Sequence, residues 1–290
     1  MSNSSNSNLT ERVTIVIPAY NATSTIVSTL NSVLDLGFKH IIVVNDGSSD
    51  STSEIVEKFP LLLINQKNSG AHKARIRGLM SLQTDFVIFL DADDSLLLPI
   101  WQLIKFLSEN DRLVGAAGGY YAFGLRRSKI VHLHDRFITQ KRLIDLGSGL
   151  FPISASVWST AAVISGQELH FPLCLEKNAD DYELAIRTSK FGDIGVADLV
   201  VSQYSMVGGK STKNTTEAAI CAFRIAHYYD LCFNSKSHSV TEIPNTSVIK
   251  RRNLQLSYYN DPKYFLALNI LRYSELLPSI IWQRIRRVWA

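Results

Sequence analysis

Short apolar runs alternate with stretches of helical spacing over the first hundred residues of the chain. The runs are rich in Val, Ile, Leu and Phe, which predicts strands over residues 13–17, 41–44, 61–64 and 86–90. The stretches between them repeat apolar residues every three or four positions, which predicts helices over residues 21–36, 50–58 and 71–82. Apolar strands that alternate with helices are typical of a mainly parallel sheet covered on both faces, with ligands bound beyond the carboxyl ends of the strands.

The pattern is weaker after residue 90. It predicts a helix over residues 99–107, a Gly- and Ala-rich strand over 113–123 and a helix over 180–189, whereas residues 135–165 give mixed signals. No repeat and no long linker is found along the chain. We therefore expect an α/β fold in three parts: a disordered leader over residues 1–11, one Rossmann-like domain over 12–215 and a helical C-terminal extension over 216–290.

Composition is that of an ordinary globular protein from a reducing compartment. Of the 290 residues, 46% are hydrophobic and 19% are charged, which is enough to build a sizeable core. Three cysteines without a C-x-x-C spacing argue against a disulfide framework or a zinc site and favour a cytoplasmic location. The Ser- and Asn-rich start lacks the features of a signal peptide, and no run reaches the roughly 18 to 20 apolar residues that cross a bilayer.

Positive charge is concentrated in the C-terminal tail. Residues 250–290 hold eight Lys or Arg against two acidic residues, whereas residues 1–249 hold 22 against 24. Aromatic and aliphatic residues are interleaved with arginines over 279–290. Two interpretations stay open: a basic amphipathic helix that lies peripherally on the inner face of the cytoplasmic membrane, or a helix that docks on its own domain. We expect no nucleic-acid partner.

Three carboxylates follow the fourth predicted strand. Asp91, Asp93 and Asp94 come directly after the apolar run 86–90, so a buried strand ends in a cluster of negative charge. Crowded carboxylates raise one another's pKa unless a cation neutralises them, and Mg²⁺ and Mn²⁺ prefer oxygen ligands. The cluster is either a solvated turn, since Asp is common in turns, or a divalent metal site.

Polar residues also follow the first two predicted strands. Pro18, Tyr20 and Asn21 come after the first strand, and the segment 45–50, Asn-Asp-Gly-Ser-Ser-Asp, comes after the second. Asp46 can accept hydrogen bonds from a nucleotide base, while the end of the segment, at Ser49 or Asp50, can cap the helix that follows. The two roles are compatible.

Basic residues gather on the helix that precedes the fourth strand. Lys73 and Arg77 are four positions apart and share a face, whereas Arg75 points elsewhere. The group is either a cationic wall that attracts a diphosphate or a solvated basic surface. His72, beside them, is expected at the surface.

An acidic pair, Asp180 and Asp181, begins a later predicted helix. Carboxylates are favourable there through the helix dipole alone. The alternative is a general base, in which one of the two takes the proton of an attacking hydroxyl.

Together these motifs resemble glycosyltransferase family 2. The motifs, in order, are Val-Ile-Pro-Ala-Tyr-Asn (16–21), Val-Asn-Asp-Gly-Ser-Ser-Asp (44–50), Asn-Ser-Gly followed by Ala-Arg and Gly (68–78), Leu-Asp-Ala-Asp-Asp (90–94) and Asp-Asp-Tyr-Glu-Leu-Ala-Ile-Arg (180–187). The resemblance covers roughly residues 12–215. It implies a GT-A fold and a hexosyltransferase-type enzyme. Such an enzyme transfers a sugar from a nucleotide-sugar donor with inversion at the anomeric carbon, and a UDP-sugar is the favoured donor.

The resemblance also implies roles for single residues. Asp46 contacts the nucleotide base in a pocket lined by Pro18, Tyr20 and Asn21. Asp181 is the catalytic base.

A metal site follows from the same resemblance. Asp91 and Asp93 form a D-x-D motif that holds Mg²⁺ or Mn²⁺ on the donor diphosphate. Asp93 is expected to be the direct ligand, Asp91 to support the metal or the donor ribose, and Asp94 to cap the following helix.

Three positions depart from the family pattern: Asn45, Ile76 and Asp180 stand where Asp, Asn and Glu are usual. The segment 204–212 resembles a mobile loop but has no His to complete a metal shell, so the third protein ligand stays open. Lys210 in this Gly-containing loop is expected to reach the donor phosphates when the loop closes, in addition to Lys73 and Arg75.

We therefore expect a metal-dependent inverting glycosyltransferase that acts on a hydroxyl of a glycan or glycolipid acceptor, in bacterial surface polysaccharide synthesis by family analogy. Acceptor choice is expected to lie in residues 115–175 and in the tail. The alternative is a catalytically silent GT-A domain that binds nucleotide sugars or serves as an assembly subunit, against which Asp46, Asp93 and Asp181 argue together. A sugar nucleotidyltransferase is disfavoured, because no Gly-rich, Arg-bearing loop follows the first strand.

Overall fold

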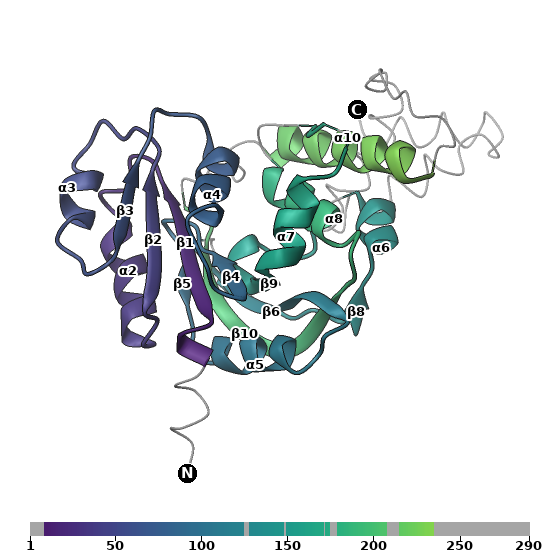
Figure 1. The fold of residues 1–290 in the computed structure, drawn as a ribbon, viewed down its shortest axis with the longest axis horizontal. Coiled ribbons are helices and arrows are strands. Elements are labelled where there is room, and N and C mark those ends of the chain that lie inside the picture. Colours follow the sequence, from purple (N-terminus) through teal and green to yellow (C-terminus); the bar gives the residue numbers. More distant parts are fainter. Residues whose placement is uncertain are drawn as a thin grey trace, which may run out of the picture.

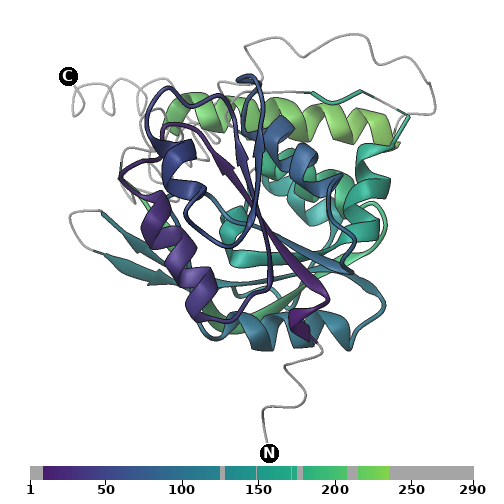
Figure 2. The same ribbon diagram turned by 60° about the vertical axis from the view of Figure 1, so that its left-hand side comes forward.

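The computed structural model describes residues 9–124, 128–147, 149–170, 172–174, 179–207 and 215–234. Within these ranges, ten strands form one sheet that is covered by helices on both faces (Figure 1). Figures 1 and 2 both place α5 and α10 on opposite sides of this sheet.

The first half of the chain alternates strands and helices in the predicted order. Its elements are β1 (Val13–Ala19), α2 (Ile26–Asp35), β2 (His40–Asn45), α3 (Thr52–Val56), β3 (Leu62–Asn65), α4 (Ala71–Leu79), β4 (Phe86–Phe89), β5 (Ser95–Leu96) and α5 (Ile100–Ser108). The second half consists of β6 (Leu113–Phe123), β7 (Lys129–Val131), β8 (Phe137–Ile138), α6 (Gln140–Leu146), the 3₁₀ helix η1 (Ile153–Ala155), β9 (Ser156–Ser159), α7 (Thr160–Gln167), α8 (Asp180–Thr188), β10 (Asp193–Ser205) and α10 (Thr215–Asn234).

Strands β1 to β4 form a parallel half-sheet in the order β3-β2-β1-β4. The pairing of β1 with β4 ends at Val16 and Phe89, so Pro18, which has no N–H to donate, lies beyond that ladder. All four strands point the same way. Their carboxyl ends therefore lie at one edge of the sheet, where ligands of parallel α/β sheets bind.

The other half of the sheet is mixed. Strand β9 is antiparallel to both of its neighbours, β4 and β6, while β6 is parallel to β10. Strand β5 pairs antiparallel with β10, through Leu96 and Ser202. This pairing brings the segment after β4 beside the end of β10, far away in sequence.

Alternate residues of the central strands enter two separate cores. Ile15 and Ile17 of β1 pack with α2 and α5, whereas Val16 packs with α8 and α10 on the other face. Because successive side chains of a strand point to opposite faces, an unbroken apolar strand of this kind is needed to fill both cores. The sheet edge is thereby held rigidly between two layers of helices.

The predicted elements of the first 124 residues are confirmed, with ends that differ by a few positions at most helices and strands. The α/β class with a central, mainly parallel sheet is confirmed as well. The mixed signals of residues 135–165 resolve into α6, η1, β9 and α7.

Helix α10 is the described part of the expected C-terminal extension. It packs on α6 and α8, and Cys221, Ile225 and Tyr229 belong to the same core as β1 and β4. No helix in the described ranges has the length and hydropathy to cross a membrane. Of the disordered leader expected over residues 1–11, residues 1–8 lie outside the described residues, as do Lys210 and the basic tail over 279–290. Residues 9–11 are described, and Leu9 is buried in the same core as Ile15 and Ile17, so the expected disorder does not extend to Leu9.

Candidate active site

The loops after β1 and β2 are fastened to each other at the carboxyl edge of the sheet. The Asn21 side-chain oxygen accepts hydrogen bonds from the N–H and hydroxyl of Ser49, and the Asn21 N–H donates to the hydroxyl of Ser48. Asn21 has a φ of 50°, in the left-handed region that Asn tolerates. Tyr20 is 45% exposed beside it.

Asp46 is buried at the end of β2. Its carboxylate accepts hydrogen bonds from the side chain of Gln66 and from the N–H groups of Ser69 and Gly70, each at 2.8 Å. A carboxylate has about four acceptor positions, so these three bonds leave room for one more donor. Asp46 therefore fixes the turn that starts α4.

Asp50 lies one residue before the N-cap of α3, Ser51, where no side-chain cap hydrogen bond is formed, so neither Ser49 nor Asp50 stands at the expected cap position. Asp50 still binds the start of the helix. It accepts hydrogen bonds from the N–H groups of Thr52 and Thr23. Burial opposes ionisation, but these bonds and the hydroxyl of Thr52 lower the pKa of Asp50 to about 2.

The three carboxylates after β4 face different surroundings. Asp94 is fully buried and accepts hydrogen bonds from the hydroxyl of Ser154 and the N–H of Ser205. The expectation that Asp94 caps the next helix is wrong, because the chain continues as β5 and α5 begins only at Ile100. Asp94 instead ties the segment to η1 and to the end of β10.

Asp91 and Asp93 are partly exposed, so both carboxylates are accessible from the edge of the sheet. Burial and the nearby negative charge of Asp91 raise the pKa of Asp93 to about 6. Within the described residues, no ion pair neutralises Asp93. A carboxylate in this situation gains from a cation.

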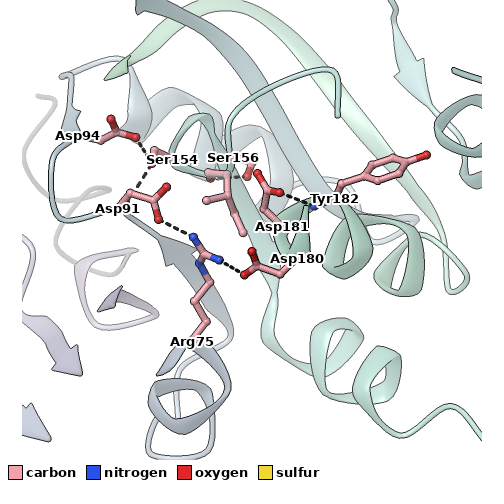
Figure 3. Close-up of polar contacts among 9 residues, drawn as sticks. Arg75, Asp91, Asp94, Ser154, Ser156, Asp180, Asp181 and Tyr182 are labelled. Carbon is pink, nitrogen blue, oxygen red and sulfur yellow. Dashed lines mark hydrogen bonds and ion pairs between the residues drawn. The ribbon is translucent and has the colours of Figure 1, made fainter. Parts of the chain in front are cut away.

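Arg75 joins the segment after β4 to the start of α8 (Figure 3). Its side chain is 6% exposed and reaches up from α4 between two carboxylates. One guanidinium nitrogen lies 2.5 Å from Asp91 Oδ1 and the other lies 2.5 Å from Asp180 Oδ2. The guanidinium of Arg75 thus binds carboxylates of the protein itself, whereas Lys73 on the same helix is exposed.

Asp181 lies next to this ion-pair cluster, in the first turn of α8. Its Oδ1 accepts a hydrogen bond from the N–H of Tyr182. Burial raises the pKa of Asp181 to about 6; Asp180 and Asp91 also raise it, while Arg75 lowers it. A carboxylate with this pKa is ionised at neutral pH and basic enough to accept a proton.

An apolar wall lies on the other side of Asp181. It encloses a cavity of about 20 Å³ lined by Leu143, Gly149, Leu150, Phe151, Ile153, Trp158, Asp181, Tyr182 and Ala185. These apolar side chains cover one side of the carboxylate, which contributes to the desolvation that raises its pKa.

The residues present fit a hard divalent cation with few protein ligands. Within the described residues, no group of three His, Cys, Asp or Glu side chains is placed to hold a metal. Two carboxylates, Asp93 and Asp91, remain at the edge, and one of them is already paired with Arg75. Mg²⁺ commonly keeps several waters and binds through one or two carboxylates and a substrate phosphate, so this oxygen set is sufficient.

Two features of the site have no clear signal in the sequence. Ser154 donates to Asp94 and accepts from the N–H of Asp91, although it lies in a stretch with mixed signals. His72 was expected at the surface but is 9% exposed, because it faces α8 rather than solvent.

A buried network stabilises the rest of α8. The hydroxyl of Tyr229 donates to Glu183 at 2.5 Å and accepts from Arg187 at 2.7 Å, so α10 is bonded to α8. Arg187 also donates to the carbonyl of Gly166 at 2.7 Å, and Glu183 accepts from the N–H of Cys174. In the sequence, the only signal for this network is the spacing of Glu183 and Arg187, which are four residues apart and therefore share a helix face.

Solved structures share this fold. The chain is similar to a mannosyltransferase from Pyrobaculum calidifontis in complex with GDP-Man and Mn²⁺, with a TM-score of 0.60, 16% identity and coverage of 96% of this chain and 80% of that chain. It is also similar to S. aureus TarS in complex with UDP-GlcNAc, with a TM-score of 0.57, 17% identity and coverage of 91% and 87%. At these identities the likeness establishes the GT-A fold alone.

Curated relatives match over the N-terminal region in shorter segments. Glycosyltransferase GlyA of Streptococcus pneumoniae is 33% identical over 121 residues, which are 39% of this chain and 17% of the relative. Poly-beta-1,6-N-acetyl-D-glucosamine synthase of Staphylococcus aureus is 38% identical over 90 residues, which are 29% of this chain and 22% of the relative. The chain thus spans less than a quarter of either relative. Residues 14–157 match the model described as Glycosyl transferase family 2, which includes Asp46, Arg75, Asp91 and Asp93, and the chain belongs to this family.

Proposed function

We propose that the chain is a metal-dependent inverting glycosyltransferase. In this proposal it moves a sugar from a nucleotide-sugar donor to a hydroxyl of a glycan or glycolipid acceptor, in bacterial surface polysaccharide synthesis. The observation that carries the proposal is the buried guanidinium of Arg75, which contacts both Asp91 of the D-x-D motif and Asp180, the neighbour of Asp181. One side chain thereby brings the expected donor site and the expected base to the same edge of the sheet.

The reaction is one in-line displacement at the anomeric carbon. Asp181 takes the proton of the acceptor hydroxyl, the acceptor oxygen forms a bond to the anomeric carbon, and the bond from that carbon to the diphosphate oxygen breaks. Asp181 is suited to this role because burial raises its pKa to about 6, while Arg75 keeps it from rising further. The apolar side chains beside Asp181 desolvate one side of its carboxylate and so support this pKa.

A divalent ion, Mg²⁺ or Mn²⁺, supplies charge neutralisation for the leaving nucleoside diphosphate when it is bound. Asp93 is the residue that we assign as direct ligand. It is partly exposed at the edge, and burial together with the charge of Asp91 raises its pKa. Asp91 is held by Arg75 and supports the ion or the donor ribose from a fixed position.

We place the nucleotide over the loops that follow β1 and β2. Tyr20 is exposed there, Asn21 fixes the loop, and Asp46 keeps one acceptor position for a base N–H. Structural neighbours are in complex with UDP-GlcNAc, UDP and GDP-Man, and we favour a UDP-sugar as the donor. Exposed Lys73 is assigned to the donor phosphates, as is Lys210 outside the described residues.

We further propose a cytoplasmic location, with peripheral contact to the inner face of the membrane through residues 279–290. Within the described residues, no two cysteines form a disulfide, which is compatible with a reducing compartment. Vesicle flotation with anionic lipid, using the full chain and a chain shortened before residue 279, tests this contact. Equal flotation of both proteins would refute it.

The proposed activity is tested by incubating the purified protein with a panel of UDP-, GDP- and dTDP-sugars and measuring release of free nucleotide or transfer to added glycans. We expect turnover of one donor class with Mn²⁺ or Mg²⁺ and none with excess chelator. The matched control is Asp198→Asn, which changes a carboxylate that is 82% exposed on β10 and should keep full activity. Metal-dependent binding of a donor without any turnover would favour the catalytically silent alternative.

A further inference from the structure

The first turn of α8 needs a fixed position if Asp181 is to act as the base, so this inference rests on the proposed function. The residue before the helix, Ala179, offers no side-chain cap. Among the described residues, Asp180 forms an ion pair with Arg75, and Asp181 accepts a hydrogen bond from the N–H of Tyr182. The first of these reaches out of the helix to another element.

We propose that Arg75 is a positioning residue that fixes the start of α8, and with it the carboxylate of Asp181, against the strand end that carries Asp91. Arg75 acts on the reaction through these two carboxylates. This role differs from the contact with the donor phosphates that its position in a basic helix predicts.

The geometry favours arginine for this role. The two carboxylates lie 16 and 105 residues from Arg75 in sequence and belong to two different elements. A guanidinium presents its donors in a rigid planar fork and can bind both at once, whereas an ammonium is a point charge on a flexible stem. The side chain of Arg75 is 6% exposed, while those of Asp91 and Asp180 are 34% and 21% exposed. The fork is therefore immobilised by burial, and the carboxylates are fixed by the fork.

The two partners of this ion pair act on Asp181 in opposite directions. Asp180 on its own helix and Asp91 after β4 raise the pKa of Asp181, whereas Arg75 on α4 lowers it. Other titratable groups also face α8: His72 on α4 faces Asp180 at the start of the helix and Glu183 farther along, and Tyr229 on α10 bonds to Glu183. Removing Arg75 or Asp180 breaks the same ion pair, but the two changes shift the pKa of Asp181 in opposite directions.

This difference separates positioning of the base from a merely structural ion pair. Protein labelled with ¹³C at the aspartate carboxyl groups is titrated by NMR, without metal or donor, and the Asp181 signal is assigned with Asp181→Asn. We expect Arg75→Gln to raise the pKa of Asp181 by about one unit and Asp180→Asn to lower it by about one unit. Arg77→Gln, an exposed charge on the same helix, is the control and should leave the titration unchanged.

A second readout separates positioning from donor contact. Arg75→Gln and Arg75→Lys should lower kcat at least about tenfold, since a displaced base costs catalysis steeply, while the affinity for Mn²⁺ and UDP stays within about twofold of the parent. Arg75→Lys, which keeps the charge, should shift the Asp181 titration less than Arg75→Gln does.

Three results would overturn the inference. They are a shift of Asp181 in the same direction in Arg75→Gln and Asp180→Asn, no shift in either, or a loss of Mn²⁺–UDP affinity in Arg75→Gln with an unchanged Asp181 titration. If Arg75→Gln does not fold, the test rests on Asp180→Asn. A pKa of Asp181 in that variant equal to that of the parent refutes the role. Absence of transfer by the parent protein would refute the proposed function instead, and the titration can still be read in that case.

Discussion

Replacing Asp181 by Asn should make the protein more stable, in a pH-dependent way. The pKa of Asp181 is raised from 3.8 to about 6, chiefly by burial and then by Asp180. The folded protein therefore binds this proton more tightly than the unfolded chain does, so the free energy of unfolding falls as the pH rises from about 4 to about 6 and stays lower above that range. Asn has no charge to bury, and its side-chain oxygen can still accept the N–H of Tyr182.

The size of the gain follows from the shift. About two pKa units correspond to about 3 kcal/mol, and partial exposure of the side chain to solvent reduces this figure. We expect Asp181→Asn to be stabilised by about 1 to 3 kcal/mol at pH 8 and by close to zero at pH 4.

Urea unfolding at a series of pH values measures this directly. The control, Asp198→Asn, removes a carboxylate that is 82% exposed and should show no comparable gain. A variant at Asp181 that is equally or less stable than the parent at pH 8 would refute the reasoning, because the carboxylate would then not be held against an energetic cost. A gain of equal size at pH 4 and pH 8 would also contradict it, since the effect would not depend on the charge.

Three further outcomes follow from the same contacts. Mn²⁺ should raise the affinity of the parent for UDP in calorimetry, and Asp93→Ala should lose this gain. If Mn²⁺ changes the UDP affinity of the variant no differently from that of the parent, Asp93 is not a ligand. The kcat/KM of the parent should rise with pH and level off above an apparent pKa near 6, because Asp181 must be ionised to accept a proton; a flat profile between pH 5 and 8 would speak against this base. Tyr229→Phe should lower the free energy of unfolding by about 1 to 3 kcal/mol, since it removes a buried hydroxyl that bonds to Glu183 and Arg187; a change under about 0.5 kcal/mol would mean that these bonds are not formed in solution.

The first half of the fold could be predicted because each element there has a local signal. The strands β1, β2 and β4 are predominantly apolar, and their residues on both faces are buried apart from His40. Strands β9 and β10 could not be predicted in the same way. Strand β9 has only four residues, and β10 has register shifts at Val196 and Val200 that interrupt its alternation, so their pairing depends on distant partners.

The candidate site could be predicted as a set of positions but not as a set of contacts. Strand ends located Asp46, Asp91 and Asp93 at one edge, because parallel strands share a direction. The partners of Arg75 lie 16 and 105 residues away, and nothing in a local pattern relates one basic residue among several to those two carboxylates. The inward orientation of Asp94 likewise depends on Ser154 and Ser205, which only the folded chain brings to it.

The most direct test of the central claim compares transfer and binding in Asp181→Asn, using the donor that the panel identifies. The account predicts that transfer falls by about 10²- to 10⁴-fold, the usual contribution of a general base, while affinity for Mn²⁺ and UDP stays within about twofold of the parent and Asp198→Asn retains full activity. Transfer by Asp181→Asn at the rate of the parent would contradict the account, because the carboxylate that Arg75 and Asp180 surround would then not be the base.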